Sequence, residues 1–137
     1  MKKKVLISAG EASGDIHAAN LVKEVRLINP EIECFGIGCG RMEQAGVRII
    51  ERMDKHAIVG VWEVFENLAF IKNLFAKFRE EIDAVRPDLA ILVDYPGFNI
   101  ELGKMLHKKG IPVVLHASRP RPRPAGRRSK RRGYPFC

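Results

Sequence analysis

Two short polar segments hold the residues whose types and spacing could do chemistry. The first spans residues 8–15, Ser-Ala-Gly-Glu-Ala-Ser-Gly-Asp, and directly follows the apolar run 5–7. In an open α/β sheet the turn between a strand and a helix is a common ligand site, and Gly10 and Gly14 would let its backbone turn sharply and approach a ligand. Glu11 places a carboxylate in the turn itself. The segment therefore predicts a binding turn that carries an acid.

Two further residues of the same segment could start the helix that follows. Ser13 and Asp15 both have side chains that accept hydrogen bonds from a helix N-terminus. The segment is neither the dinucleotide-binding glycine pattern nor a phosphate-binding loop ending in Gly-Lys-Ser/Thr. An ordinary capped helix start with a solvated Glu11 therefore remains an open interpretation.

The second polar segment is residues 94–99, Asp-Tyr-Pro-Gly-Phe-Asn, which follows the apolar run 89–93. Desolvation at the end of a buried strand would raise the pKa of Asp94, which suits a general base near neutral pH. The alternative, that Asp94 only caps the next helix or bonds the turn around Gly97, stays open. His17 falls near the same predicted edge, and we interpret it as a solvated or packing residue.

Strand and helix patterns alternate through the first 117 residues, and they must position these two segments. Short apolar runs bounded by glycine or proline predict strands, and apolar residues three or four apart predict helices. The first long helix, 16–28, should bury Ala19, Val22, Val25 and Leu27. The expected strands are 4–8, 32–37, 47–50, 89–93 and 111–115, and the expected helices are 16–28, 41–45, 61–85 and 100–109.

This alternation predicts an α/β fold, a Rossmann-like parallel sheet with flanking helices. Ligands of such sheets lie at the carboxyl ends of the strands. That edge should gather residues 8–15, residues 94–99 and a second glycine-rich loop, 36–40, which contains Gly38.

Length and composition place the chain among globular proteins of one domain. It has 137 residues, 46% of them hydrophobic, and no apolar run approaches the ~20 residues of a membrane span. The apolar run after the basic start is too short for a signal peptide, so we expect a cytoplasmic protein. The three cysteines and four histidines lack the spacing of metal ligands, and no metal site is predicted.

The net charge of +8 comes from the last twenty residues. Residues 118–137 contain eight Arg or Lys and no acid, and the remaining chain has 16 basic and 16 acidic residues. Prolines alternate with arginines at 119–124, which excludes helix and weakens any strand. We predict a domain over 1–117 and a disordered tail over 118–137. The tail either binds RNA or an anionic membrane, or is adventitious.

The ordered set of motifs resembles the lipid-A-disaccharide synthase family. The resemblance covers residues 4 to about 114, and any one motif alone is weak. Its motifs are Ser-Ala-Gly-Glu-Ala-Ser-Gly-Asp at 8–15, Phe-Gly-Ile-Gly at 35–38 with Arg41-Met42 and Ala45-Gly46, Val-Gly-Val-Trp-Glu-Val at 59–64, Pro87-Asp88, Asp-Tyr-Pro-Gly-Phe-Asn at 94–99 and Gly-Ile-Pro-Val-Val at 110–114.

The resemblance implies a GT-B glycosyltransferase, a fold in which two Rossmann-like domains face each other across a cleft. This chain would be the N-terminal half of that fold. The implied reaction is inverting. It joins UDP-2,3-diacylglucosamine to 2,3-diacylglucosamine 1-phosphate (lipid X), gives lipid A disaccharide 1-phosphate and releases UDP. No cofactor, no metal and no nucleic acid are expected.

Site residues follow from the resemblance by position. Asp94 matches a proposed general base, and Glu11 and Ser13 match polar residues that matter for activity. The substrate-binding residues expected from the matched loops are Gly10, Gly14, Gly38 and Asn99. Segment 59–75 matches an apolar and basic surface, implying that Trp62, Phe65 and Phe70 meet acyl chains at the inner membrane of a Gram-negative-type bacterium.

Two departures from the family pattern qualify these expectations. Cys39 stands where the family usually has a second glycine. After Val114 the family continues with an aromatic pair, Ser-Pro and Trp-Ala-Trp, whereas this chain turns to Arg/Pro-rich sequence, as a frameshift would produce. We therefore expect an acceptor-side fragment without the nucleotide-binding domain and with little activity alone. A non-enzymatic α/β domain with a basic tail is the competing hypothesis.

Overall fold

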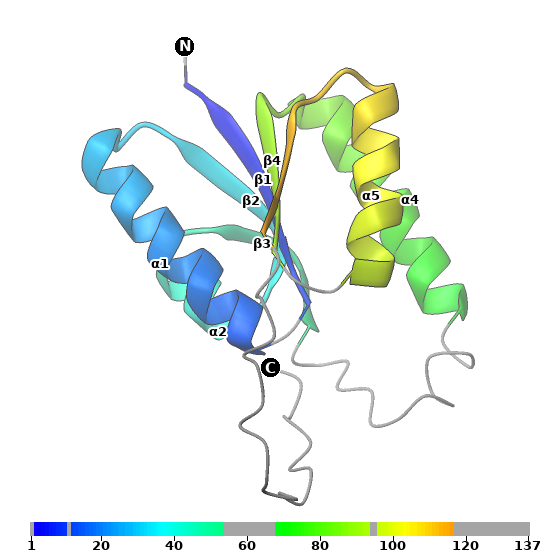
Figure 1. The fold of residues 1–137 in the computed structure, drawn as a ribbon, viewed down its shortest axis with the longest axis horizontal. Helices are drawn as coiled ribbons and strands as arrows, with labels where there is room; N and C mark the ends of the chain where they lie inside the picture. The colour runs from blue at the N-terminus through cyan, green and yellow to red at the C-terminus, as the bar shows by residue number, and fades with distance from the viewer. Residues whose placement is uncertain (1, 11, 54–67, 94–95, 117–137) are drawn as a thin grey trace, which may run out of the picture.

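The computed structural model describes residues 2–10, 12–53, 68–93 and 96–116, and these form a five-stranded sheet with helices on both faces (Figure 1). The strands are β1 (Lys4–Ala9), β2 (Glu33–Gly38), β3 (Arg48–Arg52), β4 (Leu89–Val93) and β5 (Val113–His116). The helices are α1 (Ala12–Ile28), α2 (Gly40–Gln44), α4 (Leu68–Val85) and α5 (Pro96–Lys108).

The sheet is parallel throughout, in the order β3-β2-β1-β4-β5. The chain builds outward from β1 through β2 to β3, and then returns to add β4 and β5 on the other side of β1. The strand order therefore reverses between β1 and β4, and this is the position at which open α/β sheets bind ligands. The Rossmann-like α/β fold is confirmed.

Two apolar clusters, one on each face of the sheet, hold the three layers together. Helices α1 and α2 pack on one face and α4 and α5 on the other (Figure 1). The first cluster joins α1 and α2 to the sheet through Ala18, Ala19, Val22 and Met42. The second joins α4 and α5 to it through Leu74, Phe78, Ile82, Leu102 and Leu106. The central strands β1 and β4 are thus covered on both faces, as their continuous apolar runs predict.

The two helices that follow the chemically interesting turns begin four residues earlier than predicted. Helix α1 begins at Ala12 rather than 16, and α5 begins at Pro96 rather than 100. Proline is well suited to the first helical position, because its missing N–H has no partner there anyway. A small residue near the start of α1, Gly14, lets the helix begin close against the sheet. Ser13 and Asp15 therefore lie inside α1 and not before it.

The long helical pattern is confirmed over the part that the structure describes. Helix α4 begins at Leu68, and residues 61–67 of the predicted helix lie outside the described residues. Its buried face carries Phe78 and Ile82, which are four residues apart as a helical pattern requires. In α1 the predicted stripe is wrong at one end, because Leu27 is 79% exposed. Ile28, the last residue of α1, is likewise exposed, so the end of this helix adds no apolar packing.

Candidate active site

The turn after β1 and the end of β4 meet where the strand order reverses. A Cβ atom added to Gly14 would lie 3.5 Å from the Cβ of Ala9, the Cγ1 of Val93 and the carbonyl oxygen of Val93. The first turn of α1 therefore rests against the last residues of both central strands. Gly10, which connects β1 to that turn, is buried. The described residues of the two predicted segments, 8–10 with 12–15 and 96–99, thus lie at one edge.

A buried hydrogen-bond chain ties these two strand ends together. The hydroxyl of Ser8 in β1 donates to Oδ1 of Asn99 in α5 at 2.7 Å, and Nδ2 of Asn99 donates to the Val93 carbonyl at 3.4 Å. Asn99 is 2% exposed and Ser8 is fully buried. These contacts favour a positioning role for Asn99, because its amide fixes the carbonyl that immediately precedes Asp94.

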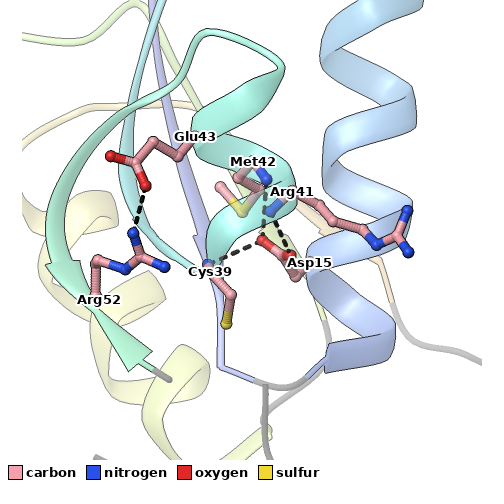
Figure 2. Close-up of polar contacts among 6 residues, drawn as sticks. All are labelled: Asp15, Cys39, Arg41, Met42, Glu43 and Arg52. Carbon is pink, nitrogen blue, oxygen red and sulfur yellow. Dashed lines mark hydrogen bonds and ion pairs between the residues drawn. The ribbon is translucent and has the colours of Figure 1, made fainter. Parts of the chain in front are cut away.

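The Asp15 carboxylate connects the first glycine-rich turn to the second (Figure 2). Its Oδ1 accepts hydrogen bonds from the backbone N–H groups of Cys39 at 2.8 Å and Met42 at 3.2 Å, and its Oδ2 accepts one from the N–H of Arg41 at 3.1 Å. Asp15 is 3% exposed. The prediction that Asp15 caps its own helix is therefore wrong. Asp15 lies inside α1 and caps α2, whose N-cap residue Cys39 provides no side-chain hydrogen bond of its own.

Gly38, the predicted substrate-binding residue of the second loop, packs directly against the side chain of Met42. A Cβ atom at this position would lie 2.2 Å from the sulfur of Met42, whose side chain is fully buried. On the other side of α2, Arg52 forms an ion pair with Glu43 at 2.6 Å (Figure 2). The loop is thus held by Asp15 on one side and by the end of β3 on the other.

Two histidines that sequence reasoning set aside lie together at the same edge. The ring centroids of His17 in α1 and His116 at the end of β5 are 5.9 Å apart. Both side chains are exposed. Their proximity could not be anticipated from a separation of 99 residues, because it depends on β5 pairing beside β4. Across the described ranges, no three metal-ligating side chains gather in one place.

The predicted site residues fall into two groups. Gly10, Ser13, Gly14, Gly38 and Asn99 lie in the described part, and Ser13 is exposed on the first turn of α1. The remaining predicted residues, Glu11, Asp94, Trp62 and Phe65, lie outside the described residues, as does the side chain of Phe70. Ser8 was not a predicted site residue. Its hydroxyl directly after an apolar run was the one feature of the sequence that could have pointed to it. Of the helices described, none is long and apolar enough to cross a bilayer.

Comparisons with known proteins agree on one family. A family model described as lipid-A-disaccharide synthetase matches residues 5–121. A lipid-A-disaccharide synthase of Koribacter versatilis is 45% identical over 116 residues, which are 84% of this chain and 30% of that protein. Lipid-A-disaccharide synthase 1 of Legionella pneumophila is 40% identical over 116 residues, again 84% of this chain and 30% of the relative.

A more distant relative belongs to the same family. A lipid-A-disaccharide synthase of Coxiella burnetii is 35% identical over 116 residues, 85% of this chain and 31% of its own length. The chain thus spans about 30% of the length of the curated relatives that it matches. Because the family model covers most of the sequence, the chain belongs to the lipid-A-disaccharide synthetase family.

Proposed function

We propose that this chain forms the acceptor-side part of an inverting glycosyltransferase of lipid A biosynthesis. The reaction would transfer a diacylglucosaminyl group from UDP-2,3-diacylglucosamine to the 6-hydroxyl of 2,3-diacylglucosamine 1-phosphate. The observation that carries the proposal is the family match over residues 5–121. The convergence of the two loops at the reversal of strand order supports it, because this is where α/β sheets bind ligands.

Asp94 is the proposed general base. Its carboxylate would accept the proton of the acceptor hydroxyl while that oxygen attacks the anomeric carbon from the face opposite UDP. The new glycosidic bond then forms as the bond to the UDP oxygen breaks, and UDP departs with the electron pair. Asn99, itself bound by the Ser8 hydroxyl, would hold the Val93 carbonyl beside this residue, so that the carboxylate is presented by a fixed backbone.

The other predicted residues have supporting roles in this proposal. Glu11 and Ser13 would contact the polar part of the substrates at the start of α1. Gly10 would let a substrate approach the backbone of the turn, and Gly14 would act indirectly, by letting the first turn of α1 lie close to Ala9 and Val93. Asn99 and Gly38 would act through the loops that they position, because both are engaged by packing or hydrogen bonds in the structure.

The proposed partners are the two acylated sugars and the inner-membrane surface. The acyl chains of both substrates would stay in the bilayer, and the enzyme would act from the cytoplasmic side. Trp62, Phe65 and Phe70 are the residues that we propose for membrane or acyl contact. RNA or membrane binding through residues 118–137 stays a prediction, because that segment lies outside the described residues.

A transfer assay tests the catalytic role of Asp94. The 137-residue chain alone should show little or no turnover, and residues 1–114 joined to the rest of the Koribacter versatilis enzyme should restore it. In that hybrid, Asp94→Asn should lower kcat by about 10²–10⁴-fold, the usual contribution of a general base.

A matched control tests whether a loss of kcat comes from the role of Asp94 or only from the removal of one negative charge. Asp88 lies just before the opposite end of β4, where its carboxylate accepts a hydrogen bond from the backbone of Lys4. Asp88→Asn should leave kcat nearly unchanged in the hybrid. An unaffected kcat in Asp94→Asn would remove Asp94 from the base role, and robust turnover by the chain alone would contradict the acceptor-side assignment.

A further inference from the structure

His17 in α1 and His116 at the end of β5 form a pair of imidazoles at the carboxyl edge of the sheet. Their ring centroids are 5.9 Å apart, and the ring planes are inclined by 58°. Both side chains are exposed. Within the part of the chain that the structure describes, neither imidazole takes part in a hydrogen bond or an ion pair. The roles proposed for the transfer reaction use neither residue.

The backbones that carry the two imidazoles are held by the same strand end. His116 pairs with Val93 in the register of β4 and β5. His17 follows Gly14 by three residues, and a Cβ atom added to Gly14 would lie 3.5 Å from the carbonyl oxygen of Val93. Ala18, the next residue of α1, is fully buried. The positions of both histidines are therefore set by the packing of the fold, and only the side-chain torsions have to change when a ligand binds. A ligand site of this kind costs little to organise.

The spacing of the pair is compatible with a shared metal ion. An imidazole nitrogen binds Zn²⁺ at about 2.0–2.1 Å, so two imidazoles on one ion have ring centroids roughly 5–6 Å apart. The separation of His17 and His116 falls in this range, and exposed side chains can turn to direct one nitrogen each towards the ion. Imidazole is a preferred ligand of Zn²⁺, Ni²⁺ and Cu²⁺, whereas Mg²⁺ and Ca²⁺ prefer oxygen.

We propose that His17 and His116 together bind one divalent transition-metal ion, with Zn²⁺ as the representative of the class. Each neutral imidazole would donate the lone pair of one ring nitrogen, and water would occupy the remaining coordination positions. The bound ion would join the start of α1 to the end of the edge strand β5, two elements that are otherwise connected through β4. The proposal goes beyond the transfer reaction and does not depend on it.

NMR of the histidine side chains in the full 137-residue chain provides a direct readout. The chain has four histidines, and the signals lost in His17→Gln and His116→Gln identify the two of the pair. Addition of ZnCl₂ should perturb both signals with the same midpoint and saturate at one ion per chain. His107, an exposed histidine in the last turn of α5, should change little over that range. MgCl₂ at the same concentration should perturb neither imidazole of the pair.

The single variants test whether the two histidines bind one ion jointly. In His116→Gln the signal of His17 reports the binding that remains, and in His17→Gln the signal of His116 does so. Each remaining imidazole should bind Zn²⁺ about 10²-fold more weakly than the pair, because the second ligand is no longer held close by. His107→Gln is the matched control, since it also removes one exposed histidine from a helix, and it should leave the midpoint of the pair unchanged.

Four outcomes would overturn the proposal. Unperturbed signals of His17 and His116 at millimolar ZnCl₂ would show that the pair binds no metal. An equal response of His107 would indicate adventitious binding by any exposed imidazole. An unchanged midpoint for the remaining histidine in either single variant would show that the two bind ions independently. Saturation at one ion per two chains, with a doubled mass in sedimentation, would place the ion between molecules.

Discussion

At the residue scale, the type of a residue predicts the kind of contact it makes but not its partner, as Asp15 shows. An aspartate after a glycine predicts a helix cap, and Asp15 is one, but of a different helix. The same limit applies to the Ser8–Asn99 bond, which joins residues 91 apart in sequence. The sequence identifies candidate polar residues and the edge where they gather, but the pairing of those residues is decided by how strands and helices pack.

Asp15→Ala should destabilise the domain by about 2–4 kcal/mol, because three backbone N–H groups would lose a charged acceptor in a buried place. Asp15→Asn keeps one acceptor oxygen and should cost less. Urea unfolding followed by circular dichroism would measure both. Asp83→Ala is the matched control, since its pair with Lys109 is on the surface and is worth at most about 1 kcal/mol. Equal losses for Asp15→Ala and Asp83→Ala would refute the capping role.

Cys34 predicts a pH dependence of stability. Burial raises the pKa of this thiol above its ordinary value of 9.0, and the nearby Arg26 opposes the rise only in part. A raised pKa in the folded state stabilises the protein below the unfolded pKa, and this contribution is lost as pH rises towards the folded value. The free energy of unfolding should therefore fall more steeply between about pH 8 and about pH 10 in the wild type than in Cys34→Ala. Parallel profiles would contradict the shift.

At the scale of elements, the sequence predicts best where one physical effect dominates. The expected strand 89–93 has the same first and last residues as β4 in the structure. A continuous apolar run between Pro87-Asp88 and Asp94 fixes both ends of the strand. The starts of α1 and α5 were missed because glycine and proline near them are typical of turns. Those residues are helical because the small side chain of Gly14 and the fixed backbone of proline suit a first helical turn against a sheet. Only tertiary packing decides between these outcomes.

Gly36 in β2 should tolerate substitution poorly. Its φ of 154° lies outside the range of most side chains, and an added Cβ would lie 1.7 Å from the carbonyl oxygen of Ile7. Gly36→Ala should therefore cost more than about 3 kcal/mol, or prevent folding. Gly97→Ala in α5 meets nothing within 4 Å and should change stability by no more than about 1 kcal/mol. Comparable thermal midpoints for the two variants would show that the close approach at Gly36 relaxes.

At the scale of the whole molecule, one edge strand of the described sheet carries exposed apolar side chains. The last strand of the described sheet, β5, carries Val114 at 48% and Leu115 at 65% exposure. Edge strands with exposed apolar side chains favour association between molecules.

Leu115→Lys should make the chain more monomeric, because a charge on an edge strand opposes pairing with a second copy. Sedimentation velocity across a concentration series would measure the change. Leu27→Lys, on the exposed end of α1, is the matched control and should have less effect. A wild-type chain that stays monomeric at high concentration would contradict association through β5.

The central place of β1 also has a consequence for how the chain is made. Its first residues pair with Glu33 and Cys34 on one side and with Leu89 and Ala90 on the other. On a ribosome that adds about 5–20 residues per second, β4 would emerge roughly 3–11 seconds after β2. During that interval β1 has β2 on one edge and no strand on the other, and this unpaired edge offers a template for wrong pairing. The fraction of nascent chains that fold correctly would then depend on how quickly β4 is translated. Synonymous codons between the two strands would therefore influence the yield of folded protein.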